Sequence, residues 1–442
     1  MNTKIRPASI AVSVLLAALV FLIPLGLAPQ PHAVLAITIL MGMLWLSEAL
    51  PLHVTALLGT VLFIFAGIDP AAAFTPYFNP TIALFFGGFV LARAMQKHGL
   101  DRRLVSTLLS WFGPAPPMFL LGLMLATGFL SLWISNTATA AIMMPLAVVT
   151  FRGIRPGRSS YAKAAVLGVA FAATIGGIGS LVGTPPNAIT VADLAEHGIQ
   201  VTFFDWAAHA LPFVIIFLPV SWLVILLLYP PDLGQVVLPL KKAMVWTPGQ
   251  KSVLAIGLFA VALWMTSSYH HVPDSAIAII MVIFLYLAGA VETMDMRLID
   301  WPVLLLLGGS MSMGAAVLSS GLASQIGSLL AVLLSGQAQF QLFATISLFG
   351  VLVTSLMSNT STAALLVPII SSLPAMAGAG VKQLAMMAGM SASFNFITPA
   401  GTPPNAMAYS SGQISVWDMA KAGVPLTILA MLLLSLLAWL FW

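Results

Sequence analysis

The chain has 442 residues, of which 60% are hydrophobic and only 6% are charged, with a formal net charge of +4. Soluble domains carry about a quarter charged residues, so this composition excludes an ordinary soluble protein. Apolar runs of about 20 residues, the length that spans a bilayer, recur from residue 8 to residue 442. There is no cysteine, which excludes disulfides and thiolate-bound metals.

The N-terminal segment allows two interpretations. Lys4 and Arg6 precede an apolar run from Ala8 to Leu27, which is also the pattern of a secretory signal peptide. The apolar part of a signal peptide is usually about 7–15 residues long. This run is long enough to span a membrane, so we expect a retained first transmembrane helix within residues 1–30. The functional interpretation below holds in either case.

The remaining apolar runs predict an all-α integral membrane protein. In the first half, we expect helices near residues 33–49, 52–67 and 80–96, a surface helix near 99–112, an apolar helical pair at about 117–150, and spans at about 161–200 and 206–229. A polar segment, 230–249, is expected to form a cytoplasmic linker. The second half gives spans near 250–267, 274–290 and 301–318, a surface helix near 321–335, a helical pair at about 338–375, and spans at about 380–412 and 421–442.

Two polar motifs occur once in each half, in the same order. Ser-Asn-Thr at 135–137 returns at 358–360, and Gly-Thr-Pro-Pro-Asn at 183–187 returns unchanged at 401–405. Both are displaced by roughly half the chain. Coincidence among apolar segments of low complexity does not account for ordered matches of this kind. The sequence therefore predicts two repeats, 31–229 and 250–442.

Charge distinguishes the possible topologies. Each Ser-Asn-Thr segment forms either two short spans or a re-entrant hairpin. With re-entrant hairpins and a cytoplasmic N-terminus, all 16 Lys and Arg residues except Lys382 lie on the cytoplasmic side, as the positive-inside rule requires. This topology has eleven transmembrane helices plus two re-entrant hairpins in the plasma (inner) membrane, with the C-terminus outside. Each repeat then has five spans, an odd number, so the repeats are inverted.

The second motif predicts a helix that is interrupted inside the membrane. Proline removes a backbone donor, and the residue before it leaves helical geometry, so Pro185 and Pro403 break their spans. Irregular backbone is tolerated at this depth only inside protein or beside a water-filled cavity. A lone proline kink, or Ser and Thr that merely join helices, would be ordinary. The same interruption in both halves instead indicates a transporter site near the midplane.

The residues around these motifs indicate the ligand. Burying an isolated charge is very costly, and no Lys or Arg lies within about ten residues of any of the four motifs. Helix N-termini, each worth roughly half a positive charge, together supply on the order of +2 and direct amides at an anion. Backbone carbonyls and the side chains of Asn136 and Asn359 suit small hard cations, which prefer oxygen.

The acidic residues bear on the coupling ion. All twelve read as near-surface or loop positions, including Glu48, Asp101, Asp193, Asp274 and Asp418. Proton relays usually need carboxylates or histidines inside the membrane. Sodium is therefore favoured over protons as the coupling ion, and exchange of anions without a coupled cation stays open.

These motifs together resemble the divalent anion:sodium symporter (DASS) family of INDY-like sodium/dicarboxylate transporters, over nearly the whole chain. The resemblance implies a homodimer in which a scaffold domain supports a mobile transport domain that moves by an elevator-type mechanism. It implies sodium-coupled symport of C4-dicarboxylates (succinate, malate, fumarate) or related di- and tricarboxylates. Some members are sodium-independent exchangers, so a dicarboxylate or sulfate exchanger is the alternative.

The resemblance also implies the ligand sets. The substrate residues would be Ser135, Asn136, Thr137, Thr184, Ser358, Asn359, Thr360, Thr402 and Pro403. The first sodium site would comprise Ser131, Ser135, Asn136 and Gly183, and the second Thr354, Met357, Asn359 and Gly401. Met357 would contribute only its backbone carbonyl, and it is bulkier than the small residue that the family often has there.

Other classes of function fit less well. An intramembrane hydrolase using Ser135 or Ser358 needs a nearby base, and no His, Lys or carboxylate is close to either serine in the sequence. A channel would show single-channel currents, whereas two occluding broken helices favour alternating access. We therefore expect a transporter with no catalytic residues, whose partners are the bilayer, sodium and a small dianion and not a nucleic acid.

Overall fold

The computed structural model describes residues 6–151, 157–236, 245–399 and 401–442. Within these ranges the chain is all-helical, apart from one isolated bridge between Met376 and Ala379. Several basic residues used to predict the topology lie outside the described residues: Lys4, Arg152, Arg155, Lys241 and Lys242. Part of the predicted linker, 237–244, lies outside them as well.

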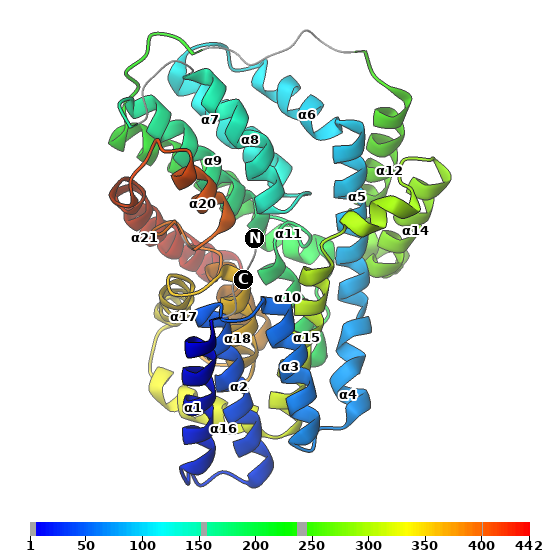
Figure 1. Ribbon diagram of the computed structural model, residues 1–442, viewed down its shortest axis with the longest axis vertical. Coiled ribbons are helices and arrows are strands. Elements are labelled where there is room, and N and C mark those ends of the chain that lie inside the picture. Colours follow the sequence, from blue (N-terminus) through cyan, green and yellow to red (C-terminus); the bar gives the residue numbers. More distant parts are fainter. Residues whose placement is uncertain (1–5, 152–156, 237–244, 400) are drawn as a thin grey trace.

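The first half contains the helices predicted from its apolar runs (Figure 1). They are α1 (Pro7–Leu22), α2 (Pro29–Ser47), α3 (Leu52–Phe65), α4 (Pro70–Phe74), η1 (Thr75–Phe78), α5 (Pro80–His98), α6 (Leu100–Leu109), α7 (Pro116–Ser131), α8 (Asn136–Thr150), α9 (Ser160–Ile178), α10 (Pro185–Glu196) and α11 (Phe203–Leu228). The short elements α4 and η1 were not anticipated, because five- and four-residue helices carry no periodicity that a sequence can reveal.

The second half follows the same order. It contains α12 (Pro248–Met265), α13 (Ser267–His270), α14 (Asp274–Leu287), η2 (Thr293–Leu298), α15 (Trp301–Ser319), α16 (Leu322–Leu334), α17 (Gln339–Thr354), α18 (Asn359–Ser371), α19 (Val381–Ser391), α20 (Pro403–Ser410) and α21 (Val416–Phe441). Among the described residues, seven helical segments are long and apolar enough to cross a membrane by length and composition. The helices that flank the two motifs are shorter than those seven, except α9.

Both Gly-Thr-Pro-Pro-Asn motifs interrupt a helix, as predicted. α9 ends at Ile178 and α10 begins at Pro185, while α19 ends at Ser391 and α20 begins at Pro403. Each proline occupies the first helical position, where its missing N–H is no loss and its fixed φ suits the turn. The Ser-Asn-Thr motifs also start helices, because Ser135 caps α8 and Ser358 caps α18.

The helices form two groups, and each group draws on both halves of the chain. We call α7–α11 with α17–α21 the motif group, and α1–α6 with α12–α16 the flanking group. In the motif group, α20 packs against α8 and α9, while α10 packs against α18 and α19. In the flanking group, α5 packs against α14 and α3 against α15. Figure 1 shows α7, α8 and α9 beside α20 and α21, with α1 and α16 near the other end of the molecule.

Buried aromatic rings join the two halves inside the motif group. Phe171 on α9 lies edge-on to Phe396, with ring centroids 5.4 Å apart. Phe213 on α11 stacks on Phe394 at 5.3 Å. Phe394 and Phe396 belong to the loop that separates α19 from α20. The second helix break is therefore held by apolar packing against helices of the first half.

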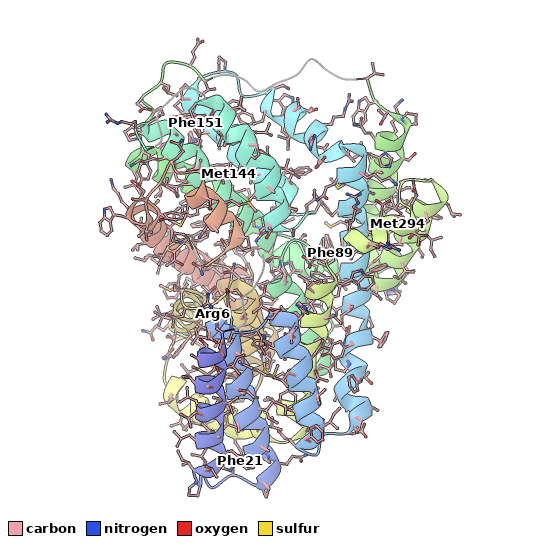
Figure 2. All side chains as sticks on the ribbon, in the orientation of Figure 1. Arg6, Phe21, Phe89, Met144, Phe151 and Met294 are labelled. Carbon is pink, nitrogen blue, oxygen red and sulfur yellow. The ribbon has the colours of Figure 1, made fainter. Side chains whose placement is uncertain are left out.

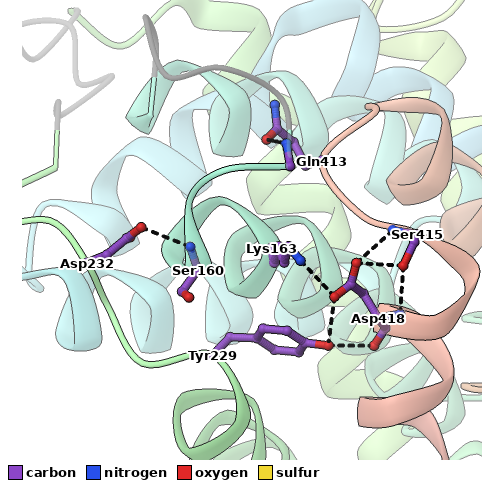
Figure 3. Close-up of polar contacts among 8 residues, drawn as sticks. Ser160, Lys163, Tyr229, Asp232, Gln413, Ser415 and Asp418 are labelled. Atoms are coloured by element: carbon purple, nitrogen blue, oxygen red, sulfur yellow. Dashed lines mark hydrogen bonds and ion pairs between the residues drawn. The ribbon is translucent and has the colours of Figure 1, made fainter.

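Polar contacts also connect the halves of each group. In the motif group, Lys163 of α9 pairs with Asp418 of α21 at 2.8 Å, and the Tyr229 hydroxyl donates to the Asp418 carbonyl at 2.8 Å (Figure 3). Figure 3 also shows Asp232 accepting a bond from the backbone N–H of Ser160, at the start of α9. These contacts fix the ends of α9, α11 and α21 relative to one another.

In the flanking group, Asp295 of η2 accepts from Arg93 at 3.0 Å and from Lys97 at 2.8 Å, both on α5. Burial raises the pKa of the Asp295 carboxyl, but hydrogen bonds from Lys97, the Glu292 amide and Arg93 outweigh burial and hold the pKa below its usual value. The carboxylate is therefore charged at neutral pH. Its contribution to stability is present above the pKa of the unfolded state and is lost as the pH falls through the lower folded pKa.

We expect Asp295→Asn to lower the stability of the protein far more than Glu292→Gln. The Asp295 side chain is only 6% exposed and serves two cations, so its loss should cost about 3 kcal/mol. Glu292 also pairs with Lys97, but its side chain is 71% exposed, and exposed pairs contribute less than about 1 kcal/mol. The stability of each variant is measured by thermal unfolding in detergent, followed by tryptophan fluorescence. Equal melting temperatures for the two variants would contradict this assignment.

Candidate functional site

In the first half, the Ser-Asn-Thr turn lies directly against the helix break. The Ser131 hydroxyl, at the end of α7, donates to Asn136 Oδ1 at 2.8 Å, at the start of α8. A Cβ atom on Gly177 would overlap Asn136 Oδ1, and one on Gly183 would lie 2.8 Å from the Ser131 carbonyl oxygen. The Ser180 hydroxyl bonds the Leu132 carbonyl. Side-chain and carbonyl oxygens of the turn and of the break thus meet in one place.

The second half repeats this geometry with threonine in place of serine. The Thr354 hydroxyl, at the end of α17, lies 2.9 Å from Asn359 Oδ1 and 2.6 Å from the Ala392 carbonyl. Asn395, in the break, donates its Nδ2 to the Thr354 carbonyl. A Cβ atom on Gly401 would overlap the Asn395 amide. Both turns therefore touch their own helix break through an Asn and a hydroxyl residue.

The final Asn of each Gly-Thr-Pro-Pro-Asn motif closes the break. Asn187 Nδ2 donates to the carbonyls of Gly177 at 2.9 Å and Ser180 at 2.7 Å. Asn405 Nδ2 donates to the carbonyls of Asn395 at 2.9 Å and Thr398 at 3.0 Å. Both side chains are fully buried. We did not predict this role from the sequence, although the repetition of the Asn after both proline pairs was a signal for it.

A cavity of about 240 Å³ opens at the second turn. The residues of the second half that line it are Ser355, Leu356, Met357, Ser358, Thr398 and Gly401. The N-terminal part of the chain contributes Arg6, Leu46, Ser47 and Glu48. No basic residue lies close to the motifs in the sequence, but Arg6, which is remote in sequence, lines the same cavity as Ser358.

Comparison with known proteins identifies the family. A model of the sodium:sulfate symporter transmembrane region matches residues 2–442, which is nearly the whole chain. The chain belongs to this symporter family. The predicted resemblance to the divalent anion:sodium symporters is thereby confirmed.

Two relatives of this symporter family cover most of the chain. An uncharacterized transporter of Haemophilus influenzae is 32% identical over 437 residues, covering 94% of this chain and 92% of the relative. The sodium-dependent dicarboxylate transporter SdcS of Staphylococcus aureus strain USA300 is 32% identical over 458 residues, covering 95% of this chain and 88% of the relative. The family and these relatives are transporters, so this chain is a membrane transporter and not an enzyme.

Solved structures with a similar fold are also transporters. The YdaH transporter of Alcanivorax borkumensis aligns with a TM-score of 0.60 at 14% identity, covering 99% of this chain and 97% of that one. MtrF of Neisseria gonorrhoeae aligns with a TM-score of 0.57 at 15% identity, covering 98% of this chain and 94% of that one. At this identity the likeness concerns the fold alone, and it supports the all-helical architecture.

The residues that the symporter resemblance implies differ in exposure. Buried ones are Ser131, Gly183, Thr184, Thr354, Met357, Asn359, Gly401 and Thr402, and half-buried ones are Ser135, Asn136, Ser358 and Thr360. Thr137 and Pro403 are exposed. Within the described part of the chain, the side chains of Thr137 and Thr360 form no hydrogen bond to protein. The structure thus joins the Ser131–Asn136 pair to Gly183 directly and the Thr354–Asn359 pair to Gly401 through Asn395, and it leaves Thr137 and Pro403 at the surface.

Three acidic side chains that we expected near the surface or in loops are buried within the protein, namely those of Asp101, Asp193 and Asp295. Asp193 on α10 and Asp101 on α6 are each only 3% exposed. Asp193 Oδ2 lies 3.7 Å from Nδ1 of His197, one helical turn later, and a Cβ atom on Gly314 of α15 would lie 3.1 Å from Asp193 Oδ1. Sequence position could not reveal this burial, because α10 is short and enclosed by α15, α18 and α19.

We expect Asn187→Asp and Asn405→Asp to abolish transport while the analogous change at Asn79 is tolerated. Aspartate keeps the shape of Asn187 and Asn405 but replaces the Nδ2 donor with an acceptor facing two carbonyls. Asn79 caps α5 through its Oδ1, which aspartate also supplies. Uptake assays on the three variants at matched expression test this. Wild-type uptake by Asn187→Asp would show that its donor bonds are dispensable.

Proposed function

We propose that the protein is a secondary transporter for sodium-coupled symport of C4-dicarboxylates such as succinate, malate or fumarate, or related di- and tricarboxylates, across the plasma membrane. The observation that carries the proposal is the pair of matched contacts, Ser131 with Asn136 and Thr354 with Asn359, each set against a helix break. Family membership and the sodium-dependent dicarboxylate relative in Staphylococcus aureus support sodium as the coupling ion and a dicarboxylate as the substrate class.

The proposed substrate site would lie among four helix N-termini. α8 begins at Asn136, α10 at Pro185, α18 at Asn359 and α20 at Pro403. Each N-terminus offers amide donors and roughly half a positive charge, so together they favour a doubly negative guest. The substrate would contact Ser135, Asn136, Thr137, Thr184, Ser358, Asn359, Thr360, Thr402 and Pro403, as the family resemblance implies.

The oxygen atoms around each glycine suit sodium as the co-transported ion. In the first half, Asn136 Oδ1, the Ser131 hydroxyl and the Ser131 and Gly177 carbonyls cluster near Gly183. In the second half, Asn359 Oδ1 and the Thr354 hydroxyl form the corresponding set, and Asn395 contacts both Gly401 and the Thr354 carbonyl. Hard cations prefer oxygen ligands of this kind. Ser135 would complete the first site, and the Met357 carbonyl the second.

We further propose the arrangement in the membrane. Residues 31–229 and 250–442 would form inverted repeats, with eleven transmembrane helices, re-entrant hairpins at α7–α8 and α17–α18, a cytoplasmic N-terminus and an outer C-terminus. The flanking group would be the scaffold of a homodimer, and the motif group would move against it as an elevator. The packing of α10 and α18 on α15 supports α15 as part of the surface along which this movement occurs.

We expect succinate uptake into proteoliposomes to require an inward sodium gradient. Succinate should accumulate when sodium is outside, and replacement of sodium by potassium should abolish accumulation. Sodium-indifferent uptake that is stimulated by preloaded dicarboxylate or sulfate would instead support the alternative, a sodium-independent anion exchanger on the same fold. The family description, which names sulfate, is the reason to include sulfate in the substrate panel.

We expect Asn136→Ala and Asn359→Ala each to weaken sodium dependence and transport together. Each side chain accepts a hydrogen bond from a hydroxyl of its proposed ion site and stands at a helix N-terminus, beside which we propose that the anion binds. Loss of one ligand should raise the sodium concentration for half-maximal uptake about tenfold, or ~1.4 kcal/mol of ion binding. Asn79→Ala, which removes a helix cap in the flanking group, is the control. A variant at either position with wild-type kinetics would remove that residue from the site.

A further inference from the structure

The cavity at the second turn contains two charges from the beginning of the chain. Arg6 precedes α1, and Glu48 ends α2, yet both line the cavity with Met357, Ser358 and Gly401. Figure 2 shows Arg6 at the end of α1 that faces the middle of the molecule, while Phe21 lies at the far end of the same helix. A basic side chain is thus held beside the turn where α18 begins.

The backbone and side chain of Arg6 are anchored to the end of α2. The Arg6 amide donates to the Ala49 carbonyl at 3.4 Å, and Nη1 donates to the Ser47 carbonyl at 3.3 Å. Glu48 adopts a left-handed conformation, with φ of 46°, where α2 ends. Carbonyls at a helix C-terminus carry partial negative charge, so this end of α2 is a favourable seat for a guanidinium.

Neither charge is neutralised within the described part of the protein. No ion pair there involves Arg6 or Glu48, although both line one cavity. A guanidinium has five donors in a planar fork, and the bond to Ser47 uses one of them. The remaining donors match the two oxygens of a carboxylate, which arginine binds more strongly and more selectively than a neutral donor does.

We propose that Arg6 is a substrate-recruiting residue, which binds one carboxylate of the dicarboxylate in this cavity while the anion moves between solvent and the N-terminus of α18. This proposal rests on the proposed function. The helix N-termini of the proposed substrate site offer only partial charges. Arg6 would add one full positive charge on the path of the anion toward that site. The molecule recognised is a dianion whose second carboxylate can reach Ser358 while the first contacts Arg6.

A role in membrane topology alone would leave affinity unchanged. A basic residue at the cytoplasmic end of a helix helps to orient the chain, and such a role affects the amount of correctly inserted protein. A recruiting role affects the concentration dependence of binding and uptake. The two roles are therefore separated by measuring affinity in purified protein that has already inserted.

The test compares Arg6→Gln, Arg6→Lys and Arg102→Gln with the wild-type protein. Arg102 is exposed on α6 and does not line the cavity, so it is a matched control for loss of one positive charge. Dicarboxylate binding is measured by calorimetry in detergent with sodium present, where both faces of the protein are accessible. KM and maximum rate of uptake are measured in proteoliposomes, and melting temperatures check folding.

We expect Arg6→Gln to raise Kd and KM for the dicarboxylate about tenfold, with a maximum rate within twofold of wild type and unchanged sodium dependence. Arg6→Lys should be intermediate, because it keeps the charge but not the planar fork, and Arg102→Gln should match wild type. Glu48→Gln should lower KM, since it removes a negative charge from the cavity.

Two results would overturn the proposal. One is an unchanged Kd and KM in Arg6→Gln with an intact melting temperature. The other is an equal rise in KM in Glu48→Gln and Arg6→Gln, which would mean that cavity shape and not charge matters. The wild-type protein tests the proposed function separately. If it transports another dianion in place of a dicarboxylate, the same comparison is made with that anion, and if it transports no anion, both proposals fail.

Discussion

An interrupted helix inside a membrane protein leaves backbone carbonyls and amides without helical partners, and the whole structure depends on how this chain provides for them. Unsatisfied polar groups are most costly where water is absent. Asn187 and Asn405 meet part of the need by donating to carbonyls on the opposite side of each break. Among the described residues, no hydrogen-bond donor reaches the buried Oδ1 atom of either side chain.

The two halves use different residues for the contacts between the Ser-Asn-Thr turn and the helix break. Gly177 faces Asn136 in the first half, whereas the corresponding contact in the second half is made by Asn395, whose amide reaches the Thr354 carbonyl. Ser131 and Thr354 likewise occupy matching positions. The second break is longer, from Ser391 to Pro403, and aromatic rings of Phe394 and Phe396 fill the additional space.

Much of the fold was predictable because the lengths of the apolar segments and the repeated motifs can be seen in the sequence itself. The helix boundaries around Pro185 and Pro403 followed from proline chemistry, and Ser135 and Ser358 are good helix caps. Proximity between distant segments was not predictable in this way. Nothing local to Arg6 indicates that it lines a cavity with Ser358, and nothing local to Asp193 indicates that three other helices enclose it. Both depend on how the two groups of helices pack.

The crossed packing of the motif group has a consequence for biosynthesis. α10 is covered by α18 and α19, and α20 by α8 and α9, so each polar interruption is shielded by helices from the opposite half. During translation the first half emerges first, with the α9–α10 interruption still lacking its cover. We therefore expect this segment to complete its packing only after α18 and α19 have been made. Maturation of the protein is therefore a late and cooperative event.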